Sequence, residues 1–284
     1  MSTKTITVFA EKGGVGKTSI TLTLATYFAD LGKRVLCIDL DKQGNLTQFF
    51  LGSSRYHQMF EEESVSALLN PKLDPEPNEI VFGTDVENVS LIPASPHMKK
   101  HLIPEKEWGE SEFEIKDFLD DLEGNFDYVF CDTPPAIDTL QTWTALLAAN
   151  YAVSPVEPEA YSSQSLHGGD LRLTAARQQN ARLVFLGYVV NLKKSRRKLH
   201  NFYEEELRGL RGDQVFTTVF RDLTEFPEAQ SERQTVLKYA PRSNAAALIR
   251  QLGDEVTARI ERTTFQKQNE LQLKQELDQQ RKAG

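Results

Sequence analysis

A short glycine-rich stretch, EKGGVGKTS at residues 11–19, contains the residue types that hold phosphate groups. Gly16, Lys17 and Thr18 fit the end of the phosphate-loop pattern G-x-x-x-x-G-K-[ST], whereas Glu11 stands where the first glycine belongs. Backbone N–H groups of such a turn surround the phosphates, the lysine reaches the β- and γ-phosphates, and the hydroxyl binds Mg²⁺. The stretch therefore predicts a nucleotide site with Mg²⁺, formed by Lys12, Gly13, Gly14, Val15, Gly16, Lys17, Thr18 and Ser19.

Carboxylates that could complete this site follow two predicted strands. Asp132 closes the apolar stretch FDYVFCD, and Asp39 and Asp41 lie at the end of the strand predicted over residues 34–39. The carboxyl ends of parallel strands face the ligand crevice, so we expect Asp132 to help hold Mg²⁺; the alternative is a helix N-cap. Hydrolysis requires a group that positions water in line with the γ-phosphorus, and Asp41, on the loop after its strand, suits that role.

The elements that must position these residues alternate along the chain between strands and helices. Strands are predicted over residues 5–10, 34–39, 89–93, 128–132, 151–156, 183–190 and 215–219, and helices over 17–31, 137–149, 163–179 and 199–210. Several strands are apolar nearly throughout, which is typical of strands covered on both faces. The pattern predicts an α/β fold with a doubly wound, mostly parallel sheet flanked by helices, and loops or insertions at residues 70–79 and 104–112.

The composition is that of an ordinary soluble globular protein. The 284 residues are 39% hydrophobic and 26% charged, with a net charge of −8, so nucleic-acid contact would have to come from a local basic cluster. No run of about 18 apolar residues is present, and no membrane span is expected. Cys37 and Cys131 lie inside apolar runs, which favours reduced core residues of a cytosolic protein.

Three motifs in order resemble those of the ParA/MinD family of deviant Walker-type ATPases: KGGVGKT at residues 12–18, DLDKQGN at 39–45 and FDYVFCDTPP at 126–135. The resemblance covers roughly residues 4–260, and the D-x-D-x-Q-x-N loop and YAPRS at 239–243 favour the ParA branch. It implies ATP and Mg²⁺ as cofactors and a homodimer that forms with ATP between its subunits.

The resemblance also assigns roles to single residues. Lys12 matches the signature lysine, which reaches the phosphates held by the other subunit; the alternative is contact with its own phosphates or with solvent. Lys42 replaces the proline that usually follows the water-positioning aspartate, here Asp41, which suggests a more mobile loop or an added surface charge. The predicted catalytic residues are Lys12, Lys17 and Asp41, and the predicted metal residues are Thr18, Asp39 and Asp132.

Residues of two later strands are expected to contact the base. Asn191, at the end of the strand over 183–190, matches the position that reads adenine, because an amide can both donate and accept; the alternative is a turn-forming asparagine. Residues 219–222 are expected to contribute backbone contacts. Within them Arg221 is counted with the base site, and Phe220 replaces a usual proline, which suggests a Phe-lined pocket.

The cluster KKSRRK at residues 193–198 places five cations in six positions of an acidic chain. A charge run is usually a solvated face, but Arg196 and Arg221 match arginines that support sequence-independent DNA binding in ParA-like proteins. The predicted DNA-binding residues are Lys193, Lys194, Arg196, Arg197, Lys198 and Arg221.

The resemblance implies a partition or positioning ATPase of the cytoplasm and nucleoid. Its ATP-bound dimer would bind DNA non-specifically, and a ParB-like or McdB-like adaptor on a plasmid, chromosome origin or protein organelle would stimulate hydrolysis and release. The alternatives are a MinD-like membrane ATPase, which needs a broadly apolar amphipathic helix, a nitrogenase-iron-protein-like ATPase, which needs paired exposed cysteines, and a phosphate-transferring metabolic enzyme.

The chain is predicted to divide into a P-loop ATPase domain over residues 1–264 and a helical or partly disordered tail over 265–284. Leu271, Leu273 and Leu277 give this tail only a thin apolar stripe, which favours a solvated helix over a partner-binding one. Because the first predicted strand begins near residue 5, no N-terminal sequence-specific DNA-binding domain is expected.

Overall fold

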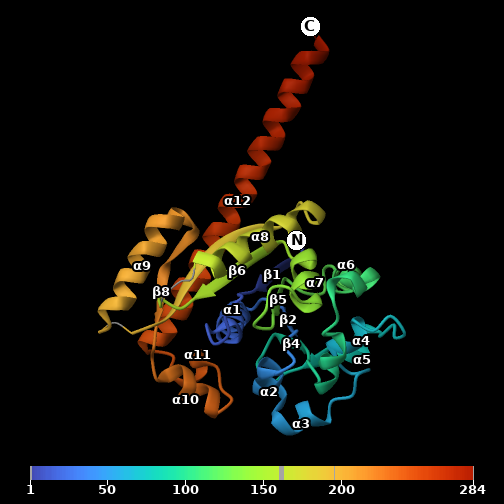
Figure 1. Cartoon of the computed structure of the whole chain (residues 1–284), viewed down its shortest axis with the longest axis vertical. Helices are drawn as coiled ribbons and strands as arrows, with labels where there is room; N and C mark the ends of the chain where they lie inside the picture. Colours follow the sequence, from blue (N-terminus) through green and yellow to red (C-terminus); the bar gives the residue numbers. More distant parts are fainter. Residues whose placement is uncertain (1, 160–162, 195, 284) are drawn as a thin grey trace.

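The computed structural model describes residues 2–159, 163–194 and 196–283 of the chain. Its strands are β1 (Lys4–Val8), β2 (Val35–Asp39), β3 (Phe82–Gly83), β4 (Val89–Ile92), β5 (Tyr128–Asp132), β6 (Tyr151–Val156), β7 (Val184–Lys193) and β8 (Val215–Arg221). They form one sheet in the order β3-β4-β2-β5-β1-β6-β7-β8, in which every pair is parallel except β3 with β4 (Figure 1).

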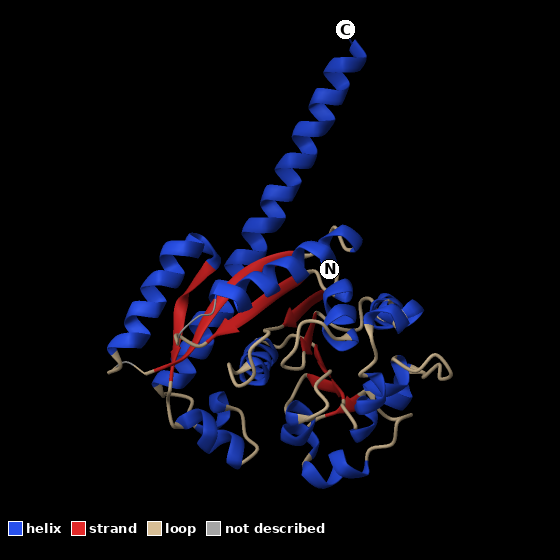
Figure 2. Ribbon diagram, viewed as in Figure 1, coloured by secondary structure: helices blue, strands red, loops and turns tan. Residues whose placement is uncertain are grey.

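Helices cover both faces of this sheet (Figure 2). They are α1 (Lys17–Asp30), α2 (Asn45–Leu51), α3 (Ser53–Gln58), α4 (Val65–Leu68), α5 (Pro77–Ile80), α6 (Glu114–Asp121), α7 (Leu140–Ala148), α8 (Ser163–Gln179), α9 (Lys198–Arg211), α10 (Glu225–Ser231), α11 (Val236–Tyr239) and α12 (Asn244–Ala283). Short 3₁₀ helices η1 (Pro96–His101), η2 (Glu105–Glu107), η3 (Gly109–Glu112) and η4 (Gly212–Gln214) lie in the connections.

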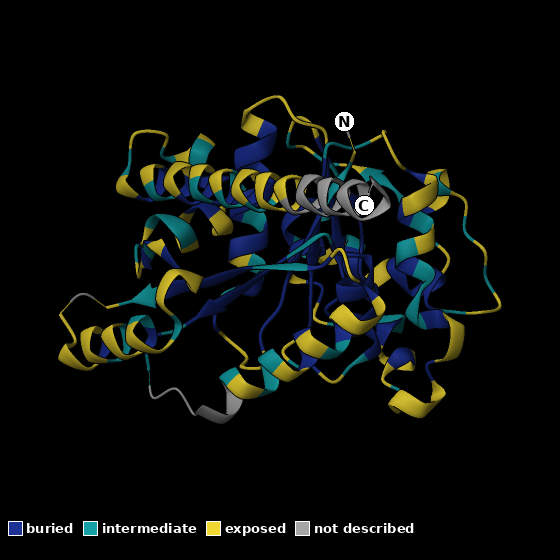
Figure 3. Ribbon diagram, turned by 90° about the horizontal axis from the view of Figure 1, so that it is seen from above, coloured by how far each residue is buried: buried dark blue, intermediate teal, exposed yellow. Residues whose placement is uncertain are grey.

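Successive residues of the central strands point to opposite faces, so one strand contributes to two hydrophobic cores. Leu36 and Ile38 of β2 belong to the core that includes α6, α7 and α8, whereas Val35 and Cys37 belong to the core that includes α1 and α12. The sheet is therefore buried on both faces while the outer sides of the helices are exposed (Figure 3), which confirms the predicted doubly wound arrangement.

All seven predicted strands form, with small shifts at their ends, but the sequence analysis missed β3. This antiparallel edge strand is two residues long, too short to produce an alternating pattern. The strand predicted to end at residue 190 is three residues longer, because β7 continues to Lys193 through an irregular register and a left-handed Leu192 with φ 56°, so Asn191 lies within it. The predicted loop over residues 104–112 contains η2 and η3.

The C-terminal helix α12 is continuous from Asn244 to Ala283, and its second half extends away from the rest of the molecule (Figure 1). Ile260 is buried, whereas Phe265 is 64% exposed. The helix passes residue 264 without a break, so the division into a domain and a tail remains a prediction. The stripe of Leu271, Leu273 and Leu277 lies outside the residues whose side chains the structure describes.

Within the described part of the chain, no helix combines the length and apolar character that crossing a membrane requires. The α12 helix is long enough, but its described residues beyond Thr263 are exposed and largely polar.

We predict that Gly253→Ala destabilises the fold by about 1–3 kcal/mol, because overpacking of a tight contact costs that much. A Cβ at Gly253 would lie 2.2 Å from the Tyr27 ring, where α12 crosses α1. The matched control is Gly209→Ala in α9, where a Cβ meets nothing within 4 Å and should leave stability unchanged or slightly raised. Thermal unfolding of both variants measures the difference, and equal melting temperatures would contradict the close packing of α1 against α12.

Candidate functional site

The phosphate loop joins the end of β1 to the start of α1 and depends on glycine at two positions. Gly14 and Gly16 have φ angles of 77° and 88°, in the left-handed region that glycine adopts most easily. A Cβ on Gly16 would also lie 2.1 Å from the Asn191 amide nitrogen. Because α1 begins directly after Gly16, its free N–H groups face the turn, as an anion site requires.

A pocket of about 390 Å³ lies at this loop. Its lining residues come from the loop and α1, the β2–α2 connection, α2, Pro135 after β5, and α10. They are Gly14, Gly16, Lys17, Thr18, Ser19, Leu22, Asp41, Gln43, Asn45, Phe49, Pro135 and Gln230. The structure thus brings together the predicted Lys17, Thr18 and Asp41, which the fold draws from two separate motifs.

Lys17 is buried at the base of this pocket, 7% exposed, and its Nζ donates to the Lys12 carbonyl at 3.4 Å. Burial lowers the pKa of Lys17, and the nearby charges of Asp132 and Asp41 oppose that shift. The Lys17 ammonium makes one described hydrogen bond, to the Lys12 carbonyl, and can donate further hydrogen bonds to phosphate oxygens.

Asp132 and Asp39 end the adjacent strands β5 and β2 in register, and both side chains are fully buried. Asp132 accepts from the Thr18 hydroxyl at 2.6 Å and from the Thr21 hydroxyl at 3.3 Å. Asp39 accepts from both the backbone N–H and the hydroxyl of Thr47, at 2.8 and 2.7 Å. Burial raises the pKa of Asp39 to about 7 and, with the charge of Asp39, raises that of Asp132 well above its usual value.

These residues fit Mg²⁺. A divalent cation near Thr18 would relieve the repulsion between the two buried carboxylates, and Mg²⁺ takes many of its ligands from water and phosphate. The described residues contain no group of three or more His, Cys, Asp or Glu side chains arranged around a metal position. Thr18 would hold the ion directly, with Asp132 and Asp39 close by.

The loop that carries Asp41 is held in place by hydrogen bonds. Asp41 is 6% exposed, its Oδ1 accepts from the Gln43 N–H at 3.0 Å, and burial raises its pKa. The Tyr56 hydroxyl donates to the carbonyl of Lys42, and a Cβ at Gly44 would collide with the Tyr56 ring. Lys42 does not restrict the backbone as the usual proline would, but the hydrogen bond from the Tyr56 hydroxyl to its carbonyl holds this part of the loop.

Lys12 lies outside the phosphate pocket of its own subunit. Its Nζ is 3.1 Å from Glu159 and 3.6 Å from Glu157, two carboxylates on the connection after β6, and half of its side chain is exposed. The sequence gives no signal for these two partners, because an acidic pair on a loop has no distinctive pattern. The structure thus separates the two lysines of the loop, with Lys17 facing inward and Lys12 facing outward.

The residues predicted to contact the base are arranged differently from the expectation. Asn191 is buried, and its amide nitrogen donates to the Val15 carbonyl at 2.8 Å, so it holds the phosphate loop in this structure. Phe220 is 2% exposed and packs 5.7 Å from the Phe226 ring in the hydrophobic core. The predicted Phe-lined pocket is therefore wrong, because strand alternation points this side chain away from the surface.

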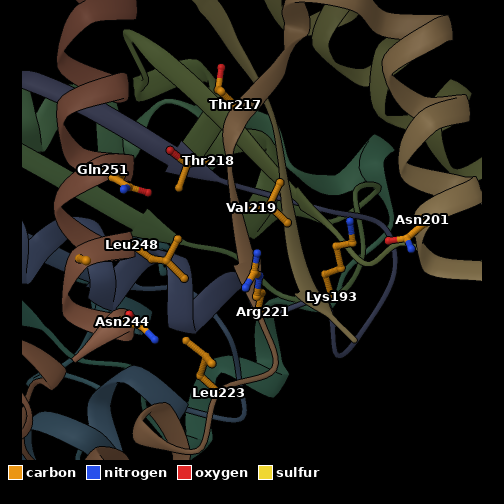
Figure 4. Close-up of a pocket in the computed structure, with 11 residues that line it drawn as sticks. Lys193, Asn201, Thr217, Thr218, Val219, Arg221, Leu223, Asn244, Leu248 and Gln251 are labelled. Carbon is orange, nitrogen blue, oxygen red and sulfur yellow. The ribbon is translucent and has the colours of Figure 1, made fainter. Parts of the chain in front are cut away.

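Arg221 and Lys193 line a separate groove of about 650 Å³ between β8, α9 and α12, at the edge of the sheet (Figure 4). Arg221 does not line the phosphate pocket. Its guanidinium and the Lys193 ammonium come from the ends of neighbouring strands, and Asn244 and Gln251 of α12 face them across the groove (Figure 4).

The basic cluster is partly neutralised within the subunit. Lys193 pairs with Glu204 at 2.5 Å, and Lys194 lies 3.7 Å from Asp222. The exposed cations Arg196, Arg197 and Lys198 make no ion pair with any residue that the structure describes. Ser195, inside the cluster, lies outside the described residues.

Several residues of the pocket had no separate sequence signal. Gln43 and Asn45 belong to the DLDKQGN motif and could have been included with it. Gln230 of α10 reaches the pocket from the far end of the chain, so only the tertiary structure reveals it. Cys37 and Cys131 are fully buried in β2 and β5, and this leaves no exposed cysteine pair for an iron–sulfur cluster in a chain with two cysteines.

We predict that Asp132→Asn lowers the affinity for Mg²⁺-nucleotide by about tenfold or more, as loss of an outer metal-site group commonly does. Affinity measured with a fluorescent ATP analogue in EDTA should change little, because the phosphate cradle is intact. Asparagine has the same shape as aspartate and removes the repulsion between residue 132 and Asp39. The free energy of unfolding of Asp132→Asn at neutral pH should therefore not fall. Asp127→Asn, at the other end of β5, is the control; an equal loss with and without Mg²⁺ would contradict the metal assignment.

Comparisons with known proteins identify the family of the chain. A family model described as an AAA domain matches residues 3–180. The chain is 35% identical to the chromosome-partitioning ATPase Soj of Thermus thermophilus, over 88% of this chain and 94% of that protein. It is 32% identical to the sporulation initiation inhibitor protein Soj of Bacillus subtilis, over 90% of this chain and 98% of that protein.

Solved structures share the fold. A McdA–ATP complex from Cyanothece has a TM-score of 0.75 at 20% identity, covering 91% of this chain and 96% of that chain. The septum site-determining protein MinD of Pyrococcus horikoshii, complexed with Mg-ADP, has a TM-score of 0.69 at 22% identity, covering 89% and 96%. Because the domain model spans most of the chain and relatives at 35% and 32% identity span nearly all of it, the chain belongs to the Soj/ParA family of partitioning ATPases.

Proposed function

We propose that this ATPase positions a cargo by forming an ATP-dependent sandwich dimer that binds DNA without sequence preference. The observation that carries the proposal is the placement of Lys12, which lies outside its own phosphate pocket although it adjoins the phosphate loop. A cation in that place is available to phosphates bound by a second copy of the chain.

The charges around the phosphate loop support a dimer that forms only when ATP is bound. Two phosphate-loop faces that each carry Lys12 and Lys17 gain attraction for each other when the negatively charged phosphates of ATP lie between them. In the single subunit Glu157 and Glu159 pair with Lys12, and the phosphates of a second subunit would replace these carboxylates. ATP would therefore contribute to binding on both sides of the interface.

Within each subunit, several described residues have different roles in ATP hydrolysis. Thr18 would hold Mg²⁺ directly, with Asp39 and Asp132 close by, and the ion would neutralise phosphate charge. Lys17 stabilises the β- and γ-phosphate oxygens, and Lys12 of the second copy adds charge as an arginine finger does. Asp41, buried at the edge of the same pocket, orients the attacking water.

DNA binding is proposed for the exposed part of the basic cluster, Arg196, Arg197 and Lys198, together with Arg221. One subunit supplies few charges, and a dimer doubles them. Each neutralised phosphate contributes about −0.9 to the salt slope, so a dimer that contacts roughly six phosphates would bind well at low salt and release readily. DNA affinity would thus follow the nucleotide state without base-specific contacts.

The function also requires a protein partner, a cargo and a location in the cell. A ParB-like or McdB-like adaptor on the cargo would stimulate hydrolysis and release the dimer from DNA. The cargo would be a plasmid, a chromosome origin or a protein organelle. The protein would act in the cytoplasm on the nucleoid, and the name of the Thermus thermophilus relative, a chromosome-partitioning ATPase, supports this place of action.

We predict that Asp41→Ala, which should slow hydrolysis, forms a dimer with Mg²⁺-ATP and stays monomeric with Mg²⁺-ADP. Adding Lys12→Ala to this variant should weaken dimerisation at least tenfold, since a charge-assisted contact is worth about 1.5–3 kcal/mol. Light scattering coupled to size-exclusion chromatography measures both. A variant that is monomeric under every condition would defeat the sandwich dimer and the role given to Lys12.

We also predict that Arg196→Ala weakens ATP-dependent DNA binding to the same degree on unrelated sequences. The salt slope should become shallower by about 1 for each phosphate that the variant no longer neutralises. Fluorescence anisotropy with two unrelated duplexes at several salt concentrations tests this expectation. Arg34→Ala is the control, because Arg34 lies directly before β2, at the amino end of that strand, and pairs with Asp127 at 3.0 Å. A weakening confined to one DNA sequence would refute non-specific binding.

A further inference from the structure

Arg233, in the turn between α10 and α11, links two parts of the chain that lie far apart in sequence. Its Nε donates to the Phe49 carbonyl at 3.0 Å and its Nη2 to the Phe50 carbonyl at 2.8 Å. Both carbonyls belong to the last turn of α2, where a helix leaves acceptors without partners and its dipole favours a cation. The guanidinium therefore caps α2 from a segment more than 180 residues away.

The backbone of Arg233 indicates that this contact is specific. Its φ of 50° lies in the left-handed region, which disfavours residues with a side chain and suits glycine. Gly52, directly after α2, has φ 87°, and a Cβ there would lie 3.3 Å from the Arg233 Nη1. Arg233 thus adopts an unfavourable backbone conformation next to a glycine that leaves room for its guanidinium. The two hydrogen bonds to the carbonyls of α2 are the best explanation for an arginine at this position.

The helix that Arg233 caps belongs to the catalytic loop. α2 starts four residues after Asp41, and its Thr47 donates two hydrogen bonds to Asp39. Asn45 and Phe49 of α2 line the phosphate pocket beside Asp41, and Gln230 of α10, three residues before Arg233, also lines it. Arg233 thus ties together two walls of one pocket, and the α2, α10 and α11 helices lie along the same side of the molecule (Figure 1).

We propose that Arg233 is a positioning residue for ATP hydrolysis. It fixes α2, and through α2 it fixes the Asp41 loop and Asp39 relative to the wall that carries Gln230. This inference rests on the proposed role of Asp41 in orienting water. Arg233 does not line the pocket, so its effect on the reaction passes through the carbonyls of Phe49 and Phe50.

The test compares Arg233→Gly with Arg233→Ala in the full-length protein. Both variants remove the guanidinium, but glycine adopts a φ of 50° freely and alanine does not, so the glycine variant should melt no lower than the alanine variant. The position is exposed, and its loss leaves no cavity in the core. Steady-state ATP hydrolysis with Mg²⁺ and non-specific DNA gives kcat and KM, and a fluorescent ATP analogue gives nucleotide affinity.

We expect both variants to lose kcat equally, by roughly tenfold, because small displacements of a positioning group have effects of that size, while nucleotide affinity changes little. Arg233→Lys, which keeps a donor for the carbonyls, should recover part of the rate. Arg250→Ala is the matched control, since this arginine also donates to a backbone carbonyl, that of Pro241, and does not line the pocket.

Wild-type kcat in Arg233→Gly would overturn the inference, and so would a rate that merely follows the melting temperature of each variant. Asp41→Ala, measured in parallel, separates this inference from the proposed function. If Asp41→Ala is inactive and Arg233→Gly is fully active, only the role of Arg233 fails. If Asp41→Ala hydrolyses ATP normally, the proposed role of Asp41 fails first.

Discussion

Two aspartates buried side by side at the carboxyl ends of β2 and β5 constrain the rest of the site. Asp39 and Asp132 are both fully buried, and like charges at such a place are unfavourable unless donors and a cation compensate them. The fold supplies hydroxyl donors from two different helices, Thr18 and Thr21 of α1 and Thr47 of α2. The pair therefore anchors both helices that border the phosphate pocket.

The same constraint explains why the phosphate loop carries two lysines with different tasks. Lys17 lies inside the site, where its charge faces Asp132 and Asp41, and in the proposed function it also faces the phosphates of its own nucleotide. Lys12 is separated from this cluster and is balanced by Glu157 and Glu159 at the surface. In the proposed dimer the outward lysine makes the arrival of a second nucleotide-bound copy favourable.

The wall of the pocket formed by the Asp41 loop and α2 combines buried residues, such as Leu46 and Phe50, with discrete polar contacts. Tyr56 holds the carbonyl of Lys42, and Arg233 holds the end of α2. These contacts come from outside the nucleotide motifs, so relatives could change the geometry of the hydrolytic loop without changing its sequence.

The parallel, doubly wound sheet, the phosphate loop and the carboxylates at strand ends could all be predicted from the amino-acid sequence. Apolar strands alternating with helices allow few other arrangements, and the motif residues are close together along the chain. The folded chain was needed to show that Asn191 lies within β7 and holds Val15, that Phe220 faces the core, and that the phosphate pocket includes Gln230. These features depend on strand register and on contacts between distant segments, which local patterns of hydrophobicity and spacing do not encode.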